Sequence, residues 1–381
     1  MPDSDSSDAP IEQDAPLNPI EAEGIEDIDE REEVVPLHYG ITSFGADFPV
    51  DSLVRRLDTG DIFIPAFDPE VSDTDANIVG FQRDFVWSKT QCDRFVESLL
   101  LGFPVPGIFL VQGSNDVYLV LDGQQRLRTL QAFYKGTLRE KTFRLQSVQE
   151  HFRSLTYETL PADVRRRLDN SIIHATVVKQ EQPSEDQSGI YMVFERLNTG
   201  GTLLQPQEIR VALFHGPLIE LLRRLNDDAD WRALCGPRSK RLKDQELILR
   251  FFAFRANGDN YRAPMKDFLN HYTGWNRNLQ HESADDLTTA FTATVRTIRE
   301  QLGDAAFRLV RAVNAAVLDS VMTAVAEGVE AGSLRTGAAL QESFRTLMAD
   351  AEYRQSVERA TAREEQVATR LSRAREHLLS H

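Results

Sequence analysis

Hydrophobic and polar positions follow two different patterns along the chain. Between residue 37 and about residue 215, short apolar or alternating runs are separated by amphipathic stretches, which predicts strands and helices in turn. The predicted strands cover 61–67, 81–87, 104–113, 115–123 and 171–180. The third and fourth of these are expected to pair as a hairpin across Gly113–Asp116.

Capping residues define the helices of this first region. Ser88 and Gln91 fit a capping box before a helix that ends at Gly102. A second helix is predicted to open at Asp122 as its N-cap and to end at Gly136. Two further helices are predicted, one over 186–198 and one starting at Pro206.

From about residue 216 onward the pattern predicts helices alone. Apolar residues at three-and-four spacing occur in 217–227, 244–256, 264–276, 284–302, 313–328 and a charged C-terminal stretch, 352–379. The fold class is therefore α+β, with an α/β domain over 37–215 and an all-helical domain over 216–381.

Negative charge is concentrated at the N-terminus. Residues 1–36 contain 13 acidic residues and one basic residue, a net charge of −12 within the −16 of the whole chain. This segment has no aromatic residue and is predicted to be disordered. The other 345 residues carry only −4 and include basic clusters at 164–168 and 237–243, so the folded part can present a positive groove.

Other features of the composition indicate a cytoplasmic protein. The two cysteines, Cys92 and Cys235, are too few for a disulfide framework and lack metal-site spacing. The acidic N-terminus is unlike a signal peptide, and the most apolar run is shorter than the roughly 20 residues that a membrane-spanning helix needs.

The motif VLDGQQR, residues 120–126, is the strongest candidate for a ligand site. An Asp122–Gln125 capping box after a Gly123 turn is the structural interpretation of this motif. That interpretation leaves Arg126 unexplained, because a cation in the first turn opposes the helix dipole by about 0.3–1 kcal/mol. A phosphate between the helix N-terminus and the guanidinium would remove that cost. Capping together with an internal salt bridge to Arg126 is the alternative.

Two flanking motifs add candidate ligands. Residues 194–210, FERLNTGGTLLQPQEIR, place Glu195 and Asn198 on one helix face, where their oxygens suit Mg²⁺, and Gly200 and Gly201 could close around a phosphate. A glycine C-cap before a new helix explains the same residues structurally.

The earlier motif FQRDFVW, residues 81–87, combines the amide of Gln82, the cation of Arg83 and the ring of Trp87. These groups suit a nucleobase or a phosphate. An edge strand with Trp87 in the core and Arg83 in solvent is the structural alternative.

Together the three motifs, in this order and approximate spacing, resemble the N-terminal domain family of the GmrSD restriction endonucleases. The resemblance covers about residues 45–350 and implies a ParB/sulfiredoxin-like domain followed by a helical one. It implies a nucleoside triphosphate and Mg²⁺ as cofactors, and DNA, including modified DNA, as partner. In ParB-like relatives a Gly-x-x-Arg turn binds the phosphates, which matches Gly123 to Arg126. The relatives' adjacent Glu-Asn pair for magnesium has no counterpart here, and Glu195 and Asn198 are the nearest candidates.

The resemblance implies a nucleotide-binding and hydrolysing subunit of a prokaryotic defence or restriction system. Arg126 would hold phosphate, Gln124 or Gln125 would orient water or the ribose, and catalysis would rest on positioning and charge. The eight histidines are scattered and form no HNH motif, so a separate nuclease chain is the expected partner. A non-hydrolysing DNA- or protein-binding adaptor and a ParB-like nuclease are the alternative functions, and the oligomeric state is open.

Overall fold

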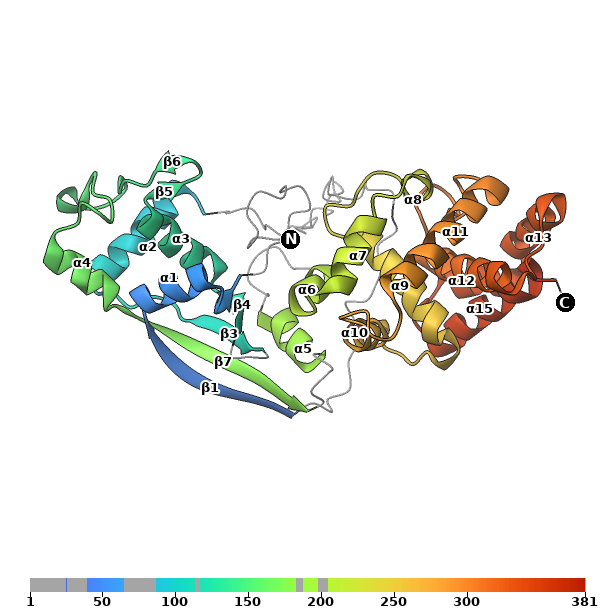
Figure 1. Ribbon diagram of the computed structural model, residues 1–381, viewed down its shortest axis with the longest axis horizontal. Helices are drawn as coiled ribbons and strands as arrows, with labels where there is room; N and C mark the ends of the chain where they lie inside the picture. The colour runs from blue at the N-terminus through green and yellow to red at the C-terminus, as the bar shows by residue number, and fades with distance from the viewer. Residues whose placement is uncertain are drawn as a thin grey trace, which may run out of the picture.

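The computed structural model describes residue 25 and residues 40–64, 87–113, 117–182, 188–197 and 205–380. Figure 1 shows an elongated molecule with a mixed α/β part at one end and a helical part at the other. The strands are β1 (Gly40–Pro49), β2 (Ile62–Phe63), β3 (Ile108–Gln112), β4 (Tyr118–Asp122), β5 (Thr137–Leu138), β6 (Lys141–Thr142) and β7 (Ile172–Gln182). The α+β fold class predicted from the sequence is confirmed.

The α/β part is built around one mixed sheet in the order β1-β7-β3-β4-β2. β1 runs antiparallel to β7 and β3 antiparallel to β4, whereas the β3–β7 and β2–β4 pairs are parallel. The predicted hairpin is confirmed as the β3–β4 pair, whose turn at 114–116 lies outside the described residues. β5 and β6 form a separate two-stranded ribbon.

Helices cover both faces of the sheet. One face packs against α1 (Val50–Thr59), α2 (Lys89–Leu100), α3 (Gln124–Lys135) and α4 (Ala162–Asp169). The other face packs against α5 (Ser188–Leu197) and α6 (Pro206–Leu213). Successive side chains of β7 point to opposite faces of the sheet, so Val177 packs in the first core and Val178 in the second.

The predicted start of α2 is confirmed in detail. The Ser88 hydroxyl accepts from the Gln91 amide at 3.3 Å, and the Gln91 side chain accepts from the Ser88 amide at 2.8 Å. Gly102 follows the helix in the left-handed region, at a φ of +73°. α6 likewise begins with Pro206 in its first turn.

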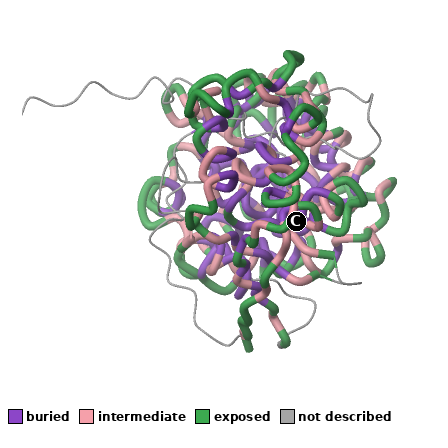
Figure 2. Tube along the Cα trace, turned by 90° about the vertical axis from the view of Figure 1, so that its left-hand side faces the viewer, coloured by how far each residue is buried: buried purple, intermediate pink, exposed green. Residues whose placement is uncertain are grey.

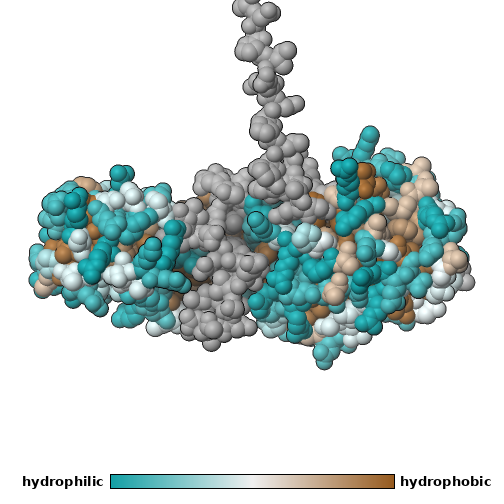
Figure 3. Space-filling view, turned by 90° about the horizontal axis from the view of Figure 1, so that it is seen from above, coloured by the Kyte–Doolittle hydropathy of each residue, from teal (hydrophilic) through white to brown (hydrophobic). Residues whose placement is uncertain are grey.

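The remaining helices form the second part of the molecule. They are α7 (Pro217–Leu225), α8 (Ala229–Cys235), α9 (Lys243–Asn257), α10 (Met265–Trp275), α11 (Ala284–Leu302), α12 (Ala315–Ala331), α13 (Gly337–Ala349), α14 (Ala351–Glu358) and α15 (Glu364–Leu378). Short 3₁₀ turns occur at Glu150–Phe152 and Gly258–Asn260. Figure 2 shows the buried residues gathered inside, under an exposed outer layer. Figure 3 shows largely hydrophilic side chains over both ends of the molecule.

A charged triad lies inside the helical core. Asp319 on α12 accepts from Arg250 of α9 at 2.7 Å and 3.0 Å, and from Arg370 of α15 at 2.9 Å. All three residues are buried. Burial lowers the pKa of Arg370, although Asp319 acts in the opposite direction.

Several sequence predictions need correction. The strand expected over 61–67 is described only as Ile62–Phe63, and residues 65–86, including the strand predicted at 81–87, lie outside the described residues. The C-terminal stretch 352–379 is two helices rather than one, because the chain turns between Glu358 and Glu364 with Ala360 at a φ of +48°. Within the described part of the chain, no helix is long and apolar enough to cross a membrane.

Candidate functional site

The turn between β4 and α3 is the centre of the candidate site. The N-cap of α3 is Gly123, at a φ of +99°, and the helix begins at Gln124. The predicted Asp122–Gln125 capping box is wrong, because Asp122 is the last residue of β4 and pairs with Phe109 in the β-ladder. A glycine N-cap has no side chain to cover the first-turn amides, so this end of the helix is open to an anion by its chemistry.

Only glycine fits this turn. A β-carbon at Gly123 would overlap the Cγ2 methyl of Ile108 on β3 and lie 3.0 Å from the Ile108 Cβ. The positive φ adds a backbone cost for any other residue. The close approach of α3 to the sheet is therefore fixed by the glycine.

The positive charge of Arg126 has partners within the protein. Its Nη2 donates to the Asp122 carboxylate and to the Gly107 carbonyl, both at 2.9 Å. The internal salt bridge, which was the alternative to a bound phosphate, is therefore present, because Asp122 at the end of β4 supplies a countercharge. The buried Nε of Arg126 has no acceptor among the described residues.

Arg128 is a cation that the sequence reasoning missed. It lies two residues after Arg126, is partly buried, and forms no ion pair with any carboxylate in the described ranges. Desolvation lowers the pKa of its guanidinium. With the Gln124 amide turned, its oxygen accepts from the Arg128 Nε and Nη2, both at 3.3 Å. The first two turns of α3 therefore carry two arginines and no carboxylate, and Asp122 at the end of β4 offsets only Arg126, which leaves positive charge that an anion would neutralise.

Gln125 joins the first and second motifs. Its Oε1 accepts from the Trp87 amide at 3.2 Å, and Trp87 packs edge-on against Phe95 with ring centroids 5.5 Å apart. The end of the FQRDFVW motif therefore lies beside the start of α3. Gln82 and Arg83 themselves are outside the described residues.

The third motif reaches the same sheet from the other face. Ile190 and Phe194 of α5 pack in one core cluster with Leu121, the residue before Asp122. Glu195 points to the helical part, where its carboxylate accepts from the buried Lys266 Nζ at 2.8 Å. Asn198, Gly200 and Gly201 are not among the described residues. In the part of the chain that is described, no three His, Cys, Asp or Glu side chains are grouped closely enough to hold a metal ion.

The stretch of chain that contains the three motifs matches one known protein family. Residues 69–215 match the family model described as the GmrSD restriction endonuclease, N-terminal domain. The matched range spans the β4–α3 turn, α5 and the NTGG loop. This part of the chain is similar to the GmrSD N-terminal domain. No curated protein matches the chain. The family indicates a subunit of a restriction system, which is directed at DNA.

Helix α6, at the end of the matched range, is fixed to the helical part by buried polar contacts. Arg210 of α6, with no exposed side chain, donates to Glu246 of α9 at 2.8 Å and to Asn270 of α10 at 2.9 Å. Glu208 of the same helix accepts from Arg241 at 2.8 Å and 3.0 Å. Removing one partner of such a buried pair costs about 3–5 kcal/mol, so these contacts specify how the two parts meet.

Proposed function

We propose that the chain binds and hydrolyses a nucleoside triphosphate as a subunit of a DNA-targeting restriction system. The observation that carries this proposal is the excess of positive charge at the start of α3: Arg126 pairs with one exposed carboxylate beside a glycine N-cap, and Arg128 has no carboxylate partner among the described residues. Phosphate oxygens would accept from the first-turn amides and from both guanidiniums.

The Asp122–Arg126 pair does not oppose this binding strongly. Asp122 is 54% exposed, so water screens the carboxylate side of the pair, and the carboxylate is free to turn into solvent. A triphosphate with several negative charges would displace the carboxylate from Arg126. The Arg126 Nε would then gain the acceptor that the described residues do not give it.

The other residues of the site have roles in the same proposal. Gln124 or Gln125 would orient water or the ribose, and Arg83 and Gln82 would contact phosphate or base. Asn198 and Glu195 would hold Mg²⁺, which usually keeps one or two protein oxygens together with substrate phosphates. Gly200 and Gly201 would bring the NTGG backbone close to the ligand. Hydrolysis would rest on positioning and charge stabilisation without a covalent intermediate.

Phosphate release by the purified full chain tests the proposal. Each of the four common nucleoside triphosphates is supplied with Mg²⁺, with and without DNA. Loss of a preorganised charge contact costs about 10²–10³-fold in rate, which is expected for both Arg126→Ala and Arg128→Ala. Arg153→Ala is the matched control, because Arg153 is an exposed arginine of the same part that pairs with the exposed Glu150.

The possible outcomes separate the candidate functions. Release that is equal in wild type, Arg126→Ala and Arg128→Ala would remove the proposal. Binding without release would favour a non-hydrolysing adaptor. Cleavage of plasmid DNA by the chain alone would favour a ParB-like nuclease.

A further inference from the structure

A charged pocket lies in the helical part, away from the β4–α3 turn. It has a volume of about 350 Å³ and opens between the end of α7, the loop after α8 and the start of α9. Its lining residues are Glu220, Arg223, Arg224, Asn226, Asp227, Arg238 and Gln245. None of these residues was a candidate in the sequence analysis, although Arg238 belongs to the basic cluster at 237–243.

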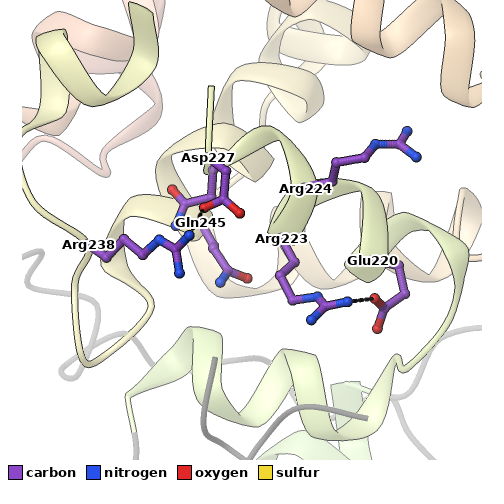
Figure 4. A pocket seen from close by; sticks show the side chains of 7 residues that line it. Glu220, Arg223, Arg224, Asp227, Arg238 and Gln245 are labelled. Atoms are coloured by element: carbon purple, nitrogen blue, oxygen red, sulfur yellow. Dashed lines mark hydrogen bonds and ion pairs between the residues drawn. The ribbon is translucent and has the colours of Figure 1, made fainter. Parts of the chain in front are cut away.

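The lining carries an excess of positive charge. Arg223 pairs with Glu220 at 2.9 Å and Arg238 pairs with Asp227 at 2.5 Å. Arg224 forms no ion pair within the described ranges, and Figure 4 shows it pointing away from the Arg223–Glu220 pair. Three guanidiniums against two carboxylates favour an occupant with negative charge.

Two buried oxygens show what else the occupant must supply. Oε1 of Gln245, a residue only 2% exposed, has no hydrogen-bond donor among the described residues. The same holds for Oε1 of Glu220. Buried acceptors without a donor are unfavourable, so a fitting ligand brings N–H groups as well as anionic groups. A phosphodiester backbone offers acceptors only, whereas an acidic peptide offers carboxylates and backbone amides together.

This chain contains such a peptide at its own N-terminus. Residues 1–24 include no lysine or arginine and seven acidic residues, namely Asp3, Asp5, Asp8, Glu12, Asp14, Glu21 and Glu23. The next residue, Ile25, is 7% exposed, packs in the core of the helical part and forms a parallel bridge with Val313. The acidic segment is therefore tethered to the helical part.

A chain of contacts leads from the tether toward the loop that carries Arg238. Val313 also bridges to Arg308, whose Nη2 donates to the Leu234 carbonyl of α8 at 3.0 Å. Leu234 lies four residues before Arg238 along the chain. An extended chain spans about 3.3–3.6 Å per residue, so the 24 residues before Ile25 can span about 80 Å, which is long enough to reach a pocket in the same helical part.

We propose that the pocket between α7 and α9 binds acidic peptide, and that residues 1–24 are its occupant in the same chain. Glutamate or aspartate side chains of the segment pair with Arg223, Arg224 and Arg238. Backbone amides of the segment donate to the Glu220 and Gln245 oxygens. The acidic N-terminus is then a specific intramolecular ligand and does more than keep the protein soluble.

Carbodiimide cross-linking of the full-length chain tests this contact. Arg238→Lys keeps the positive charge and places a primary amine in the pocket, where it can be coupled to a nearby carboxylate. Peptide mass spectrometry then reads the cross-links between position 238 and residues 1–24, separately from coupling to Asp227. Arg345→Lys is the matched control, because Arg345 is an exposed arginine on α13, paired with Glu342.

The proposal predicts cross-links from residues 1–24 to position 238 and not to position 345. Arg223→Glu with Arg224→Glu, added to Arg238→Lys, should reduce the cross-linked fraction about tenfold, which corresponds to about 1.4 kcal/mol. Adding Glu21→Lys and Glu23→Lys to this triple variant exchanges the charges on the two sides and should restore part of the contact. The carboxylates of Glu12 and Asp14 would then be the ones that couple to position 238.

Three results would overturn the proposal. The first is an equal yield of cross-links at positions 238 and 345. The second is a yield that the charge reversals leave unchanged. The third is cross-linking only between chains, read from a mixture of ¹⁴N- and ¹⁵N-labelled protein. If the charge reversals instead weaken DNA binding while the cross-links persist, the pocket is a nucleic-acid contact and the peptide is not its occupant.

Discussion

Replacing Gly123 by alanine tests whether the sheet and α3 approach as closely as the structure indicates. The new β-carbon would overlap the Ile108 Cγ2 methyl, and the φ of +99° is unfavourable for alanine. The backbone term is about 1–2 kcal/mol and overpacking adds about 1–3 kcal/mol. We expect Gly123→Ala to lower the free energy of unfolding by about 2–5 kcal/mol, measured by urea denaturation.

Two further variants separate the backbone term from the steric term. Gly136, at the other end of the same helix, has a φ of +75° and open space where a β-carbon would be. Gly136→Ala should therefore cost only the backbone term. Ile108→Leu removes the Cγ2 methyl at similar volume, so the double variant Gly123→Ala, Ile108→Leu should lose less stability than the sum of its single variants. A cost for Gly123→Ala no larger than that for Gly136→Ala would refute the close approach.

Three other expectations concern buried ionisable groups. Asp319→Asn should lower the free energy of unfolding by about 3–5 kcal/mol, because two buried guanidiniums lose their countercharge. A decrease below about 1 kcal/mol in urea denaturation would contradict this expectation. Desolvation lowers the pKa of His215 below 6.5, so its neutral form stabilises the fold above pH 6.5 and that contribution is lost as the pH falls below it. Urea unfolding at pH 5 and pH 7.5 should therefore show a smaller pH dependence for His215→Gln than for wild type, and equal dependence would argue against the desolvated histidine. Burial raises the pKa of Cys92 and Cys235, so both thiols should resist iodoacetamide until urea unfolds the chain, and rapid alkylation of the native protein would contradict their burial.

Local signals in the sequence predicted most helix boundaries. Ser88, Gly102 and Gly136 mark ends of helices where the sequence placed them, because capping is chemistry between near neighbours. The start of α3 was misplaced for a long-range reason: Asp122 pairs with Phe109 of β3, and this ladder holds its backbone in the strand. β1 and α1 were not predicted, since most of β1 is exposed and lacks a clear apolar alternation.

The sequence predicted which segments form the candidate site, but not the contacts between their side chains. The sequence identified the DGQQR turn, but it did not identify Asp122 as the partner of Arg126, although their four-residue spacing permits the pair. It also passed over Arg128, which has no carboxylate partner among the described residues, a property that depends on packing. Contacts such as Glu195–Lys266 join residues 71 positions apart and carry no local signal.

We propose above all that phosphate binds at the first turn of α3. Hydrogen–deuterium exchange of the full-length chain, read by mass spectrometry on peptides covering 122–128, measures this directly with and without a nucleoside triphosphate and Mg²⁺. We predict that nucleotide slows exchange in these peptides and that Arg128→Ala abolishes the effect. Nucleotide binding confirmed by calorimetry, with exchange at 122–128 unchanged, would contradict it.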